Sequence, residues 1–299
     1  MLHYFDISKW KLSILSGILI GLAYPPSPLG FLAWFGLIPL IHIILNSSIF
    51  NSLKYSYVTG LIVNSITVYW FGLNSGAGFA TAIISMIAAI LYLSIFWLIL
   101  GLVCSWYHQK TGYGLFVFSL LWVSIEYLRS FGPLSFPWIN LGLTQTFSLP
   151  LIQIADVTGT MGISFWIVML NIIIYLAINS KRIEKKILSI GVLLLTVIFL
   201  LGFFRISIIQ NQDILNNIST AIVQPNIDPN LKWEENFRDR IFNTMDSLHI
   251  KAIEHNPDFI LWPEAALPTY LRLNYSTKRS ILKKVKESNI PLLTGTPDR

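Results

Sequence analysis

The stretch ATAIISMIAAILYLSIFWLILGLVCSW occupies residues 80–106 and contains no charged side chain. A helix needs about 20 consecutive apolar residues to cross the hydrocarbon core of a bilayer, so this stretch predicts a membrane span. The whole chain has a matching composition, with 54% hydrophobic and only 12% charged residues. Soluble domains carry about 25% charged residues. We therefore expect a polytopic membrane protein, because the apolar residues form long runs rather than periodic stripes.

The helical membrane domain is expected to cover residues 1–205 with about seven spans. Two of the predicted spans, the first and the fifth, are shorter than the length that a bilayer requires. The apolar segments lie roughly at residues 12–24, 29–46, 55–73, 79–105, 115–128, 161–178 and 187–204.

The positive charges predict the orientation of this domain. Residues 1–205 contain ten Lys or Arg and four Asp or Glu (net +6), whereas residues 206–299 contain eleven of each (net zero). Only Arg129 and Arg205 fall on one side of the predicted spans. The other side carries eight cations: Lys9, Lys11, Lys54, Lys110, Lys181, Arg182, Lys185 and Lys186. Because cytoplasmic loops are enriched in Lys and Arg, we expect a cytoplasmic N-terminus and residues 206–299 on the outer side. The net charge lies in the membrane part and therefore gives no indication of a nucleic-acid partner.

The Cys and His residues do not predict a metal or cofactor site. Cys104 is the only cysteine, so an intrachain disulfide is impossible. It lies within the apolar run, where we expect a small, unreactive packing residue. The five histidines do not cluster at ligand spacings, and we expect His249 and His255 to lie on the surface of a polar helix.

Residues 206–299 are predicted to form the beginning of an α/β domain. Short apolar runs at 219–227, 258–262 and 290–295 are typical of buried strands. Between them lie an amphipathic helix at 232–255 and a basic amphipathic helix at 276–289. This alternation predicts a sheet with helical crossovers, although three strands are few for an independent domain.

The segment DFILWPEAALPTY, residues 258–270, contains the strongest candidate for a catalytic group. Glu264 follows a predicted strand end, which is where open α/β sheets bind their ligands. Trp262 and the prolines at 263 and 268 are expected to restrict the backbone and shield the carboxylate from water. Glu264 is therefore either a general base or a loop glutamate that caps the next helix, and the residues alone favour neither.

Two charges lie at the end of the fifth apolar segment. Glu126 and Arg129 are three residues apart and are predicted to form an ion pair at the membrane interface. Arg129 is also a candidate for binding a lipid phosphate. The residues favour the simpler interpretation, a salt bridge that allows the helix to end among the headgroups.

The chain resembles the bacterial apolipoprotein N-acyltransferases. In residues 206–299 the resemblance rests on AIVQPNIDPNLKWEENFRDR (221–240), DFILWPEAALP (258–268) and PLLTG (291–295). In the membrane part it rests on GFLAWFGLIPLI (30–41), LWVSIEYLRSFGPLSFPWINLGLTQ (121–145) and ADVTGTMGISFWIVMLN (155–171). These motifs run over nearly the whole chain and in the same order.

The resemblance implies a fold, a location and a reaction. The family has a multi-pass domain in the bacterial inner membrane, followed by a periplasmic nitrilase-like domain, an αββα sandwich. A Glu-Lys-Cys triad takes an acyl chain from a phospholipid as a thioester and passes it to the N-terminal diacylglyceryl-cysteine amine of a lipoprotein. Glu264 matches the general base, and Trp233 matches a tryptophan that handles substrate. No cofactor, metal or nucleic acid is implied.

The chain departs from the family after Glu264. The lysine and cysteine of the triad lie well downstream in the family, but no cysteine follows Glu264 here. The lysines at 278, 283, 284 and 286 do not match the lysine motif. Three interpretations stay open: an incomplete and inactive acyltransferase, one half of a split enzyme that needs a complementing C-terminal fragment, and a non-enzymatic protein that binds lipid or lipoprotein.

Overall fold

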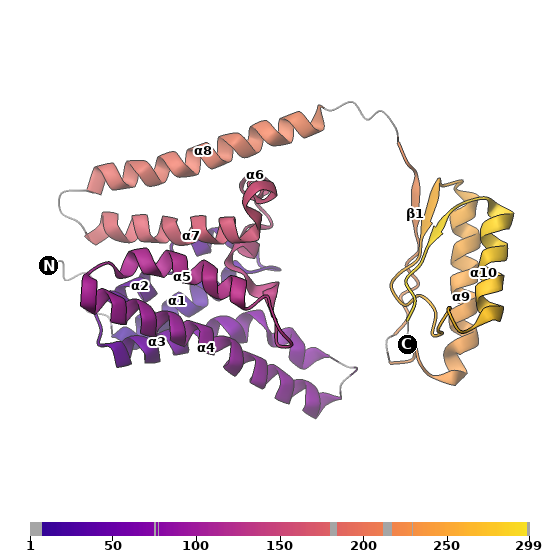
Figure 1. The fold of residues 1–299 in the computed structure, drawn as a ribbon, viewed down its shortest axis with the longest axis horizontal. Coiled ribbons are helices and arrows are strands. Elements are labelled where there is room, and N and C mark those ends of the chain that lie inside the picture. The colour runs from indigo at the N-terminus through magenta and orange to yellow at the C-terminus, as the bar shows by residue number, and fades with distance from the viewer. Residues whose placement is uncertain are drawn as a thin grey trace. The chain divides into compact units, whose positions relative to one another are not determined.

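A computed structural model describes residues 8–74, 76, 78–179, 184–211, 217–228 and 230–297. The chain divides into two compact units, Met1–Gln212 and Asp213–Arg299. Within the described ranges, the first unit is helical and the second is built on a three-stranded sheet (Figure 1). Of the cations used to predict topology, Lys181 and Arg182 lie outside the described residues.

Helices occur at each apolar segment of the first unit. The elements are α1 (Lys9–Ala23), η1 (Gly30–Trp34), α2 (Ile38–Leu45), α3 (Ile49–Thr67), η2 (Tyr69–Leu73), α4 (Phe79–Thr111), α5 (Gly114–Leu128), η4 (Pro137–Ile139), η5 (Leu141–Gln145), α6 (Leu149–Ile152), α7 (Ala155–Asn179) and α8 (Glu184–Gln210). In the described ranges three helices are long and apolar enough to cross a membrane: α4, α7 and residues Ser189–Gln210 of α8. The apolar helices Gly30–Leu45 and Gly114–Leu128 are shorter. These helices support a membrane protein, and the count of seven spans stays a prediction.

The second apolar segment is a broken helix rather than a continuous one. Its backbone leaves helical geometry between η1 and α2, which frees polar groups in an apolar environment. The side chain of Asn171 on α7 pairs with both ends of the break. Its Nδ2 donates to the Ala33 carbonyl at 2.7 Å, and its Oδ1 accepts from the Leu37 N–H at 2.9 Å. One buried amide therefore replaces the hydrogen bonds that the helix loses.

Small residues allow α3 and α4 to approach closely. A Cβ atom on Gly101 of α4 would lie 2.2 Å from Ser56 Oγ and 2.8 Å from the Ser52 carbonyl of α3. Likewise, a Cβ atom on Gly60 of α3 would lie 2.7 Å from the Trp97 ring. Small residues at such contacts are typical of helices that pack within a membrane.

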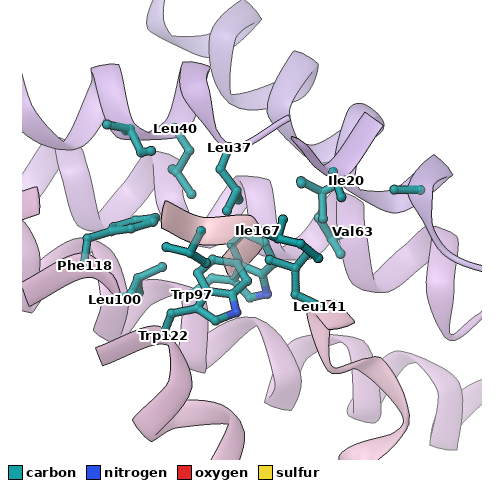
Figure 2. Close-up of a cluster of buried hydrophobic side chains, with 14 of the residues drawn as sticks. Ile20, Leu37, Leu40, Val63, Trp97, Leu100, Phe118, Trp122, Leu141 and Ile167 are labelled. Atoms are coloured by element: carbon teal, nitrogen blue, oxygen red, sulfur yellow. The ribbon is translucent and has the colours of Figure 1, made fainter. Parts of the chain in front are cut away.

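Aromatic and aliphatic side chains from several helices form the core of the first unit. Figure 2 shows Trp97 of α4 beside Trp122 of α5, with Val63, Leu141 and Ile167 nearby. The two indole rings meet edge to face, with centroids 5.1 Å apart and planes at 87°. This arrangement is a favourable one for aromatic pairs and joins α4 to α5.

The second unit has the predicted order of strands and helices. Its elements are β1 (Thr220–Ile222), α9 (Glu235–Glu254), β2 (Phe259–Leu261), α10 (Tyr275–Ser288) and β3 (Leu292–Leu293). The strands are parallel in the order β1-β2-β3, with Ala221 opposite Ile260 and Ile260 opposite Leu292. Helices α9 and α10 lie side by side on one face of this sheet (Figure 1).

One histidine prediction is wrong. His249 of α9 is only 1% exposed, and its ring meets Trp262 edge to face at 5.3 Å. The position lies four residues after Met245 and eight after Ile241, both buried, so it belongs to the buried stripe of α9. His255, at the end of α9, is exposed as expected.

Candidate functional site

Glu264 lies in a turn that directly follows β2. Trp262 before it is buried, as are Ala266 and Leu267 after it, so the chain is anchored on both sides of the carboxylate. Glu264 itself is exposed. The expected shielding from water is therefore not found within this unit, although the buried anchors that the sequence predicts are present.

The backbone of this turn is tightly constrained. Ala265 has a φ of +50°, a conformation that costs a residue with a side chain about 1–3 kcal/mol. The chain beyond β3 lies against the turn, because a Cβ atom on Gly295 would be 2.8 Å from the Cα atom of Glu264. The Thr296 hydroxyl strengthens this contact by accepting the Leu271 N–H at 3.3 Å. The backbone position of Glu264 is thus set by neighbouring segments rather than by its own side chain.

The other candidates of the second unit are not gathered around Glu264. Trp233 lies in the turn before α9 and is 58% exposed, and no hydrogen bond or ring contact joins it to Glu264 in the described residues. On α10, Lys284 forms an ion pair with Asp246, and Lys283 lies 3.6 Å from Glu287. Neither lysine contacts the Glu264 carboxylate.

Arg129 lies in the first unit, at the end of α5, and is buried. Its side chain is only 6% exposed. Its Nη2 donates to the Ile139 carbonyl at 3.2 Å and to Asn140 Oδ1 at 2.9 Å. Arg129 therefore holds the turn that follows η4.

Glu126 holds the same turn from one helical turn earlier. Its Oε1 accepts the Leu141 N–H at 2.7 Å and the Trp122 Nε1–H at 2.9 Å. The expected ion pair with Arg129 is not formed among the described residues; the two buried charges interact only through space. The 139–141 turn instead provides hydrogen bonds to one atom of each charged group, Oε1 of Glu126 and Nη2 of Arg129.

Two further polar side chains of the first unit, Tyr24 and Gln145, form long-range hydrogen bonds but are not predicted as site residues from the sequence. Tyr24 donates its hydroxyl to the Ile139 carbonyl at 2.8 Å. Gln145 donates to the Gly30 carbonyl at 2.9 Å and accepts from Trp34 Nε1 at 2.9 Å. A sequence signal for such residues exists: a polar side chain within or beside an apolar segment usually has a hydrogen-bond partner in the fold.

Cys104 has no catalytic neighbour in the part of the chain that the structure describes. It is fully buried on α4, as expected for a packing residue. In the same ranges, no group of three or more His, Cys, Asp or Glu is placed to hold a metal ion.

The apolar helices and the buried charges define a helical membrane protein with a second, α/β unit. The sequence model described as the apolipoprotein N-acyltransferase N-terminal domain matches residues 16–173. The chain therefore belongs to the apolipoprotein N-acyltransferase family.

Curated relatives carry the same family name. An apolipoprotein N-acyltransferase of Geobacter metallireducens is 29% identical over 303 residues, which cover 96% of this chain and 57% of the relative. The apolipoprotein N-acyltransferase of Chlorobaculum tepidum is 28% identical, and the match covers 96% of this chain and 55% of the relative. The enzyme of that name from Rickettsia prowazekii is 29% identical, and the match covers 94% of this chain and 57% of the relative. The chain thus spans a little over half the length of these relatives.

Proposed function

We propose that this chain supplies the membrane part and the general base of an N-acyltransferase. The donor is a phospholipid, and the acceptor is the N-terminal diacylglyceryl-cysteine amine of a lipoprotein. The match of residues 16–173 to the family, together with relatives of that name along 96% of the chain, carries this proposal.

The second unit is, in this proposal, the first part of a nitrilase-like αββα domain. Its sheet is parallel and covered by helices on one face, and parallel sheets are usually covered on both. On the opposite face Ile222 pairs in register with Leu261, which pairs with Leu293. Ile222 and Leu293 are exposed in this unit, which suits a face that a second sheet covers.

Glu264 is the proposed general base. It takes the proton from a cysteine thiol, and the thiolate attacks the acyl ester of the phospholipid. The lysophospholipid leaves as its alcohol with the proton that Glu264 returns. The lipoprotein amine then attacks the thioester, the C–S bond breaks, and the amide and the free cysteine thiol are formed, with the amine proton passing to the sulfur through Glu264. The position of Glu264 after a parallel strand supports this role, because that edge of an α/β sheet is where ligands bind.

The thiol must come from outside these 299 residues. Cys104 is the only cysteine, and its sulfur is buried among apolar side chains, where the reactive thiolate is disfavoured. A cysteine and a lysine are therefore supplied by further sequence, either on the same polypeptide or on a complementing C-terminal fragment. The 55–57% coverage of the relatives leaves room for such a segment.

Two further residues have proposed roles in substrate binding. The exposed ring of Trp233 is available to contact an acyl chain or a lipopeptide. Arg129 is the weaker candidate for a lipid phosphate, because its burial and its bonds to the 139–141 turn favour a structural role.

The proposed location is the bacterial inner membrane, with a cytoplasmic N-terminus and the second unit in the periplasm. The eight-to-two distribution of cations between the predicted loops supports this orientation.

The test uses purified protein, a phospholipid with a tagged acyl chain, and a diacylglyceryl lipopeptide. The chain alone is expected to transfer no tag. Adding the part of the Geobacter relative that this chain does not cover is expected to place the tag first on protein and then on peptide. A hydroxylamine-labile tag on the chain alone, lost in Cys104→Ser, would overturn the assignment of the nucleophile. Lipid binding with no transfer under either condition would favour the non-enzymatic alternative.

A further inference from the structure

A small, partly open cavity lies in the first unit, beside the end of α5. Its volume is about 30 Å³, and three polar side chains line it: Tyr24, Glu126 and Arg129. The rest of the wall is apolar and includes Val63, Trp97 and Trp122. The cavity is therefore a polar corner beside the aromatic core, whose residues Val63, Trp97 and Trp122 are labelled in Figure 2.

Two atoms of the charged side chains have no hydrogen-bond partner in the protein. They are Oε2 of Glu126 and Nε of Arg129, and both are fully buried. The residues themselves are 3% and 6% exposed. Leaving such an atom unpaired costs about 1–3 kcal/mol, and more for a charged group, so a partner is expected.

The two side chains do not satisfy each other. They line the same cavity without forming an ion pair, although they interact electrostatically. Opposite charges that face one space from beyond hydrogen-bond distance are the arrangement in which a bridging water is expected. A cavity needs only about 10–15 Å³ of such space to hold one water molecule, so this one is large enough.

The main competing donor is Ser164. Its hydroxyl lies close enough to the Glu126 carboxyl to donate a hydrogen bond to it. However, Ser164 Oγ accepts the Gly142 N–H at 2.8 Å and directs its proton to the Thr160 carbonyl at 3.3 Å. In this orientation of the hydroxyl, Oε2 of Glu126 keeps an unfilled acceptor position.

We propose that this cavity is a binding site for an ordered water molecule that bridges Glu126 and Arg129. The water donates to Oε2 of Glu126 and accepts from the Nε–H of Arg129. Its second proton points to the Tyr24 hydroxyl oxygen, whose own proton is already donated to the Ile139 carbonyl. A lipid chain in this space would leave both charged atoms unpaired.

The bridging water links the two side chains that hold the 139–141 turn. Glu126 binds the turn through the Leu141 N–H, and Arg129 binds it through Ile139 and Asn140. With the water in place, the carboxylate, the guanidinium and the phenol form one continuous hydrogen-bonded network. This network rests on the geometry of the first unit alone and is independent of the proposed acyl transfer.

The direct test is a structure of the full chain in lipid nanodiscs, at a resolution that shows ordered water. The expected result is one compact density peak about 2.7–3.2 Å from both Glu126 Oε2 and Arg129 Nε. An empty cavity, elongated density of an acyl chain, or a Ser164 hydroxyl turned toward Oε2 would each overturn the proposal.

A second test measures thermal unfolding of the full chain in detergent. Val63→Ile adds one methylene to the cavity wall, and Val168→Ile is the control, because Val168 is fully buried but does not line the cavity. If water is displaced, Val63→Ile lowers the melting temperature by several degrees more than Val168→Ile. This difference in melting temperature between the two variants disappears when both are made in a Glu126→Leu/Arg129→Leu background. A neutral or stabilising Val63→Ile would show a dry cavity and contradict the proposal.

Discussion

The carboxylate of Glu126 accepts the backbone N–H of Leu141 at 2.7 Å, across fifteen residues of sequence. Arg129, one helical turn after Glu126, binds Ile139 and Asn140 of the same turn. The FPW segment at 136–138, which carries part of the family resemblance, therefore ends in a turn held by two buried charges. Such charges are costly in an apolar environment, so this network is a part of the unit where substitutions should have large effects.

Replacing Glu126 by leucine should destabilise the first unit. The Leu141 N–H and the Trp122 Nε1–H both lose their acceptor, at a cost of about 1–3 kcal/mol for each unsatisfied group. Thermal unfolding in detergent measures the effect. Tyr127→Leu, which alters the adjacent exposed position, is the control and should change the melting temperature little. Equal melting temperatures for the two variants would show that Glu126 does not hold the turn.

Gly101→Ala should weaken the packing of α3 against α4. The added Cβ would lie 2.2 Å from Ser56 Oγ, and overpacking of this kind costs about 1–3 kcal/mol. The second substitution Ser56→Gly removes the nearest clashing atom and should restore part of the loss. Leu102→Ala, at a partly exposed position on α4, is the control. If Ser56→Gly does not restore any stability, the clash with Ser56 is not the cause of the loss in Gly101→Ala.

Glu264→Gln should abolish acyl-enzyme formation when the chain is supplemented as described above. The amide has nearly the same size but cannot take a proton, and loss of a general base costs about 10²–10⁴-fold in rate. Tagged thioester is measured together with the amount of protein in the membrane, which should not change. Glu254→Gln, an exposed carboxylate at the end of α9, is the matched control. Normal thioester formation in Glu264→Gln would make the glutamate structural.

The stability of the second unit should decrease in mild acid because of His249. Burial lowers the pKa of this imidazole, nearby Lys284 lowers it further, and Asp246 opposes the shift. A folded-state pKa below the unfolded value of about 6.5 means that the unfolded state binds the extra proton more readily. The contribution of neutral His249 is therefore complete above about pH 6.5 and is lost as the pH falls through the folded-state pKa.

Unfolding of this unit is measured by limited proteolysis in denaturant from pH 7.5 to pH 5. His249→Leu should flatten the pH dependence, whereas His255→Leu, at the exposed residue that follows the same helix, should leave it unchanged. Identical pH profiles for wild type and His249→Leu would show that His249 does not cause the pH dependence of stability.

The predicted topology is tested by reporter fusions in bacteria. Alkaline phosphatase fused after residue 299 should be active, because that enzyme requires the periplasm, and a cytoplasmic fluorescent reporter there should be silent. Fusions after Thr111, at the end of α4, should show the reverse pattern, since the adjacent Lys110 belongs to the predicted cytoplasmic loops. The same pattern at both sites would contradict the predicted alternation of spans.

Local sequence patterns are enough to predict which segments form apolar helices and how the second unit alternates strands and helices. These features depend on local properties: the length of an apolar run, as at 80–106, and the period of apolar residues, as in α9. The sequence also places Glu264 directly after a strand, because the apolar run 258–262 ends at a proline. The family motifs likewise consist of residues that are close together in sequence.

Contacts between residues that are distant in sequence could not be predicted in this way and are seen only in the folded protein. Asn171 stabilises the break between η1 and α2, and Glu126 and Arg129 bind the 139–141 turn instead of each other. His249 lies against Trp262 rather than on the surface. Each of these contacts joins residues more than ten positions apart or depends on which face of a helix is covered. A buried polar group takes whichever partner the packing brings within hydrogen-bond distance, and that distance is a property of the fold.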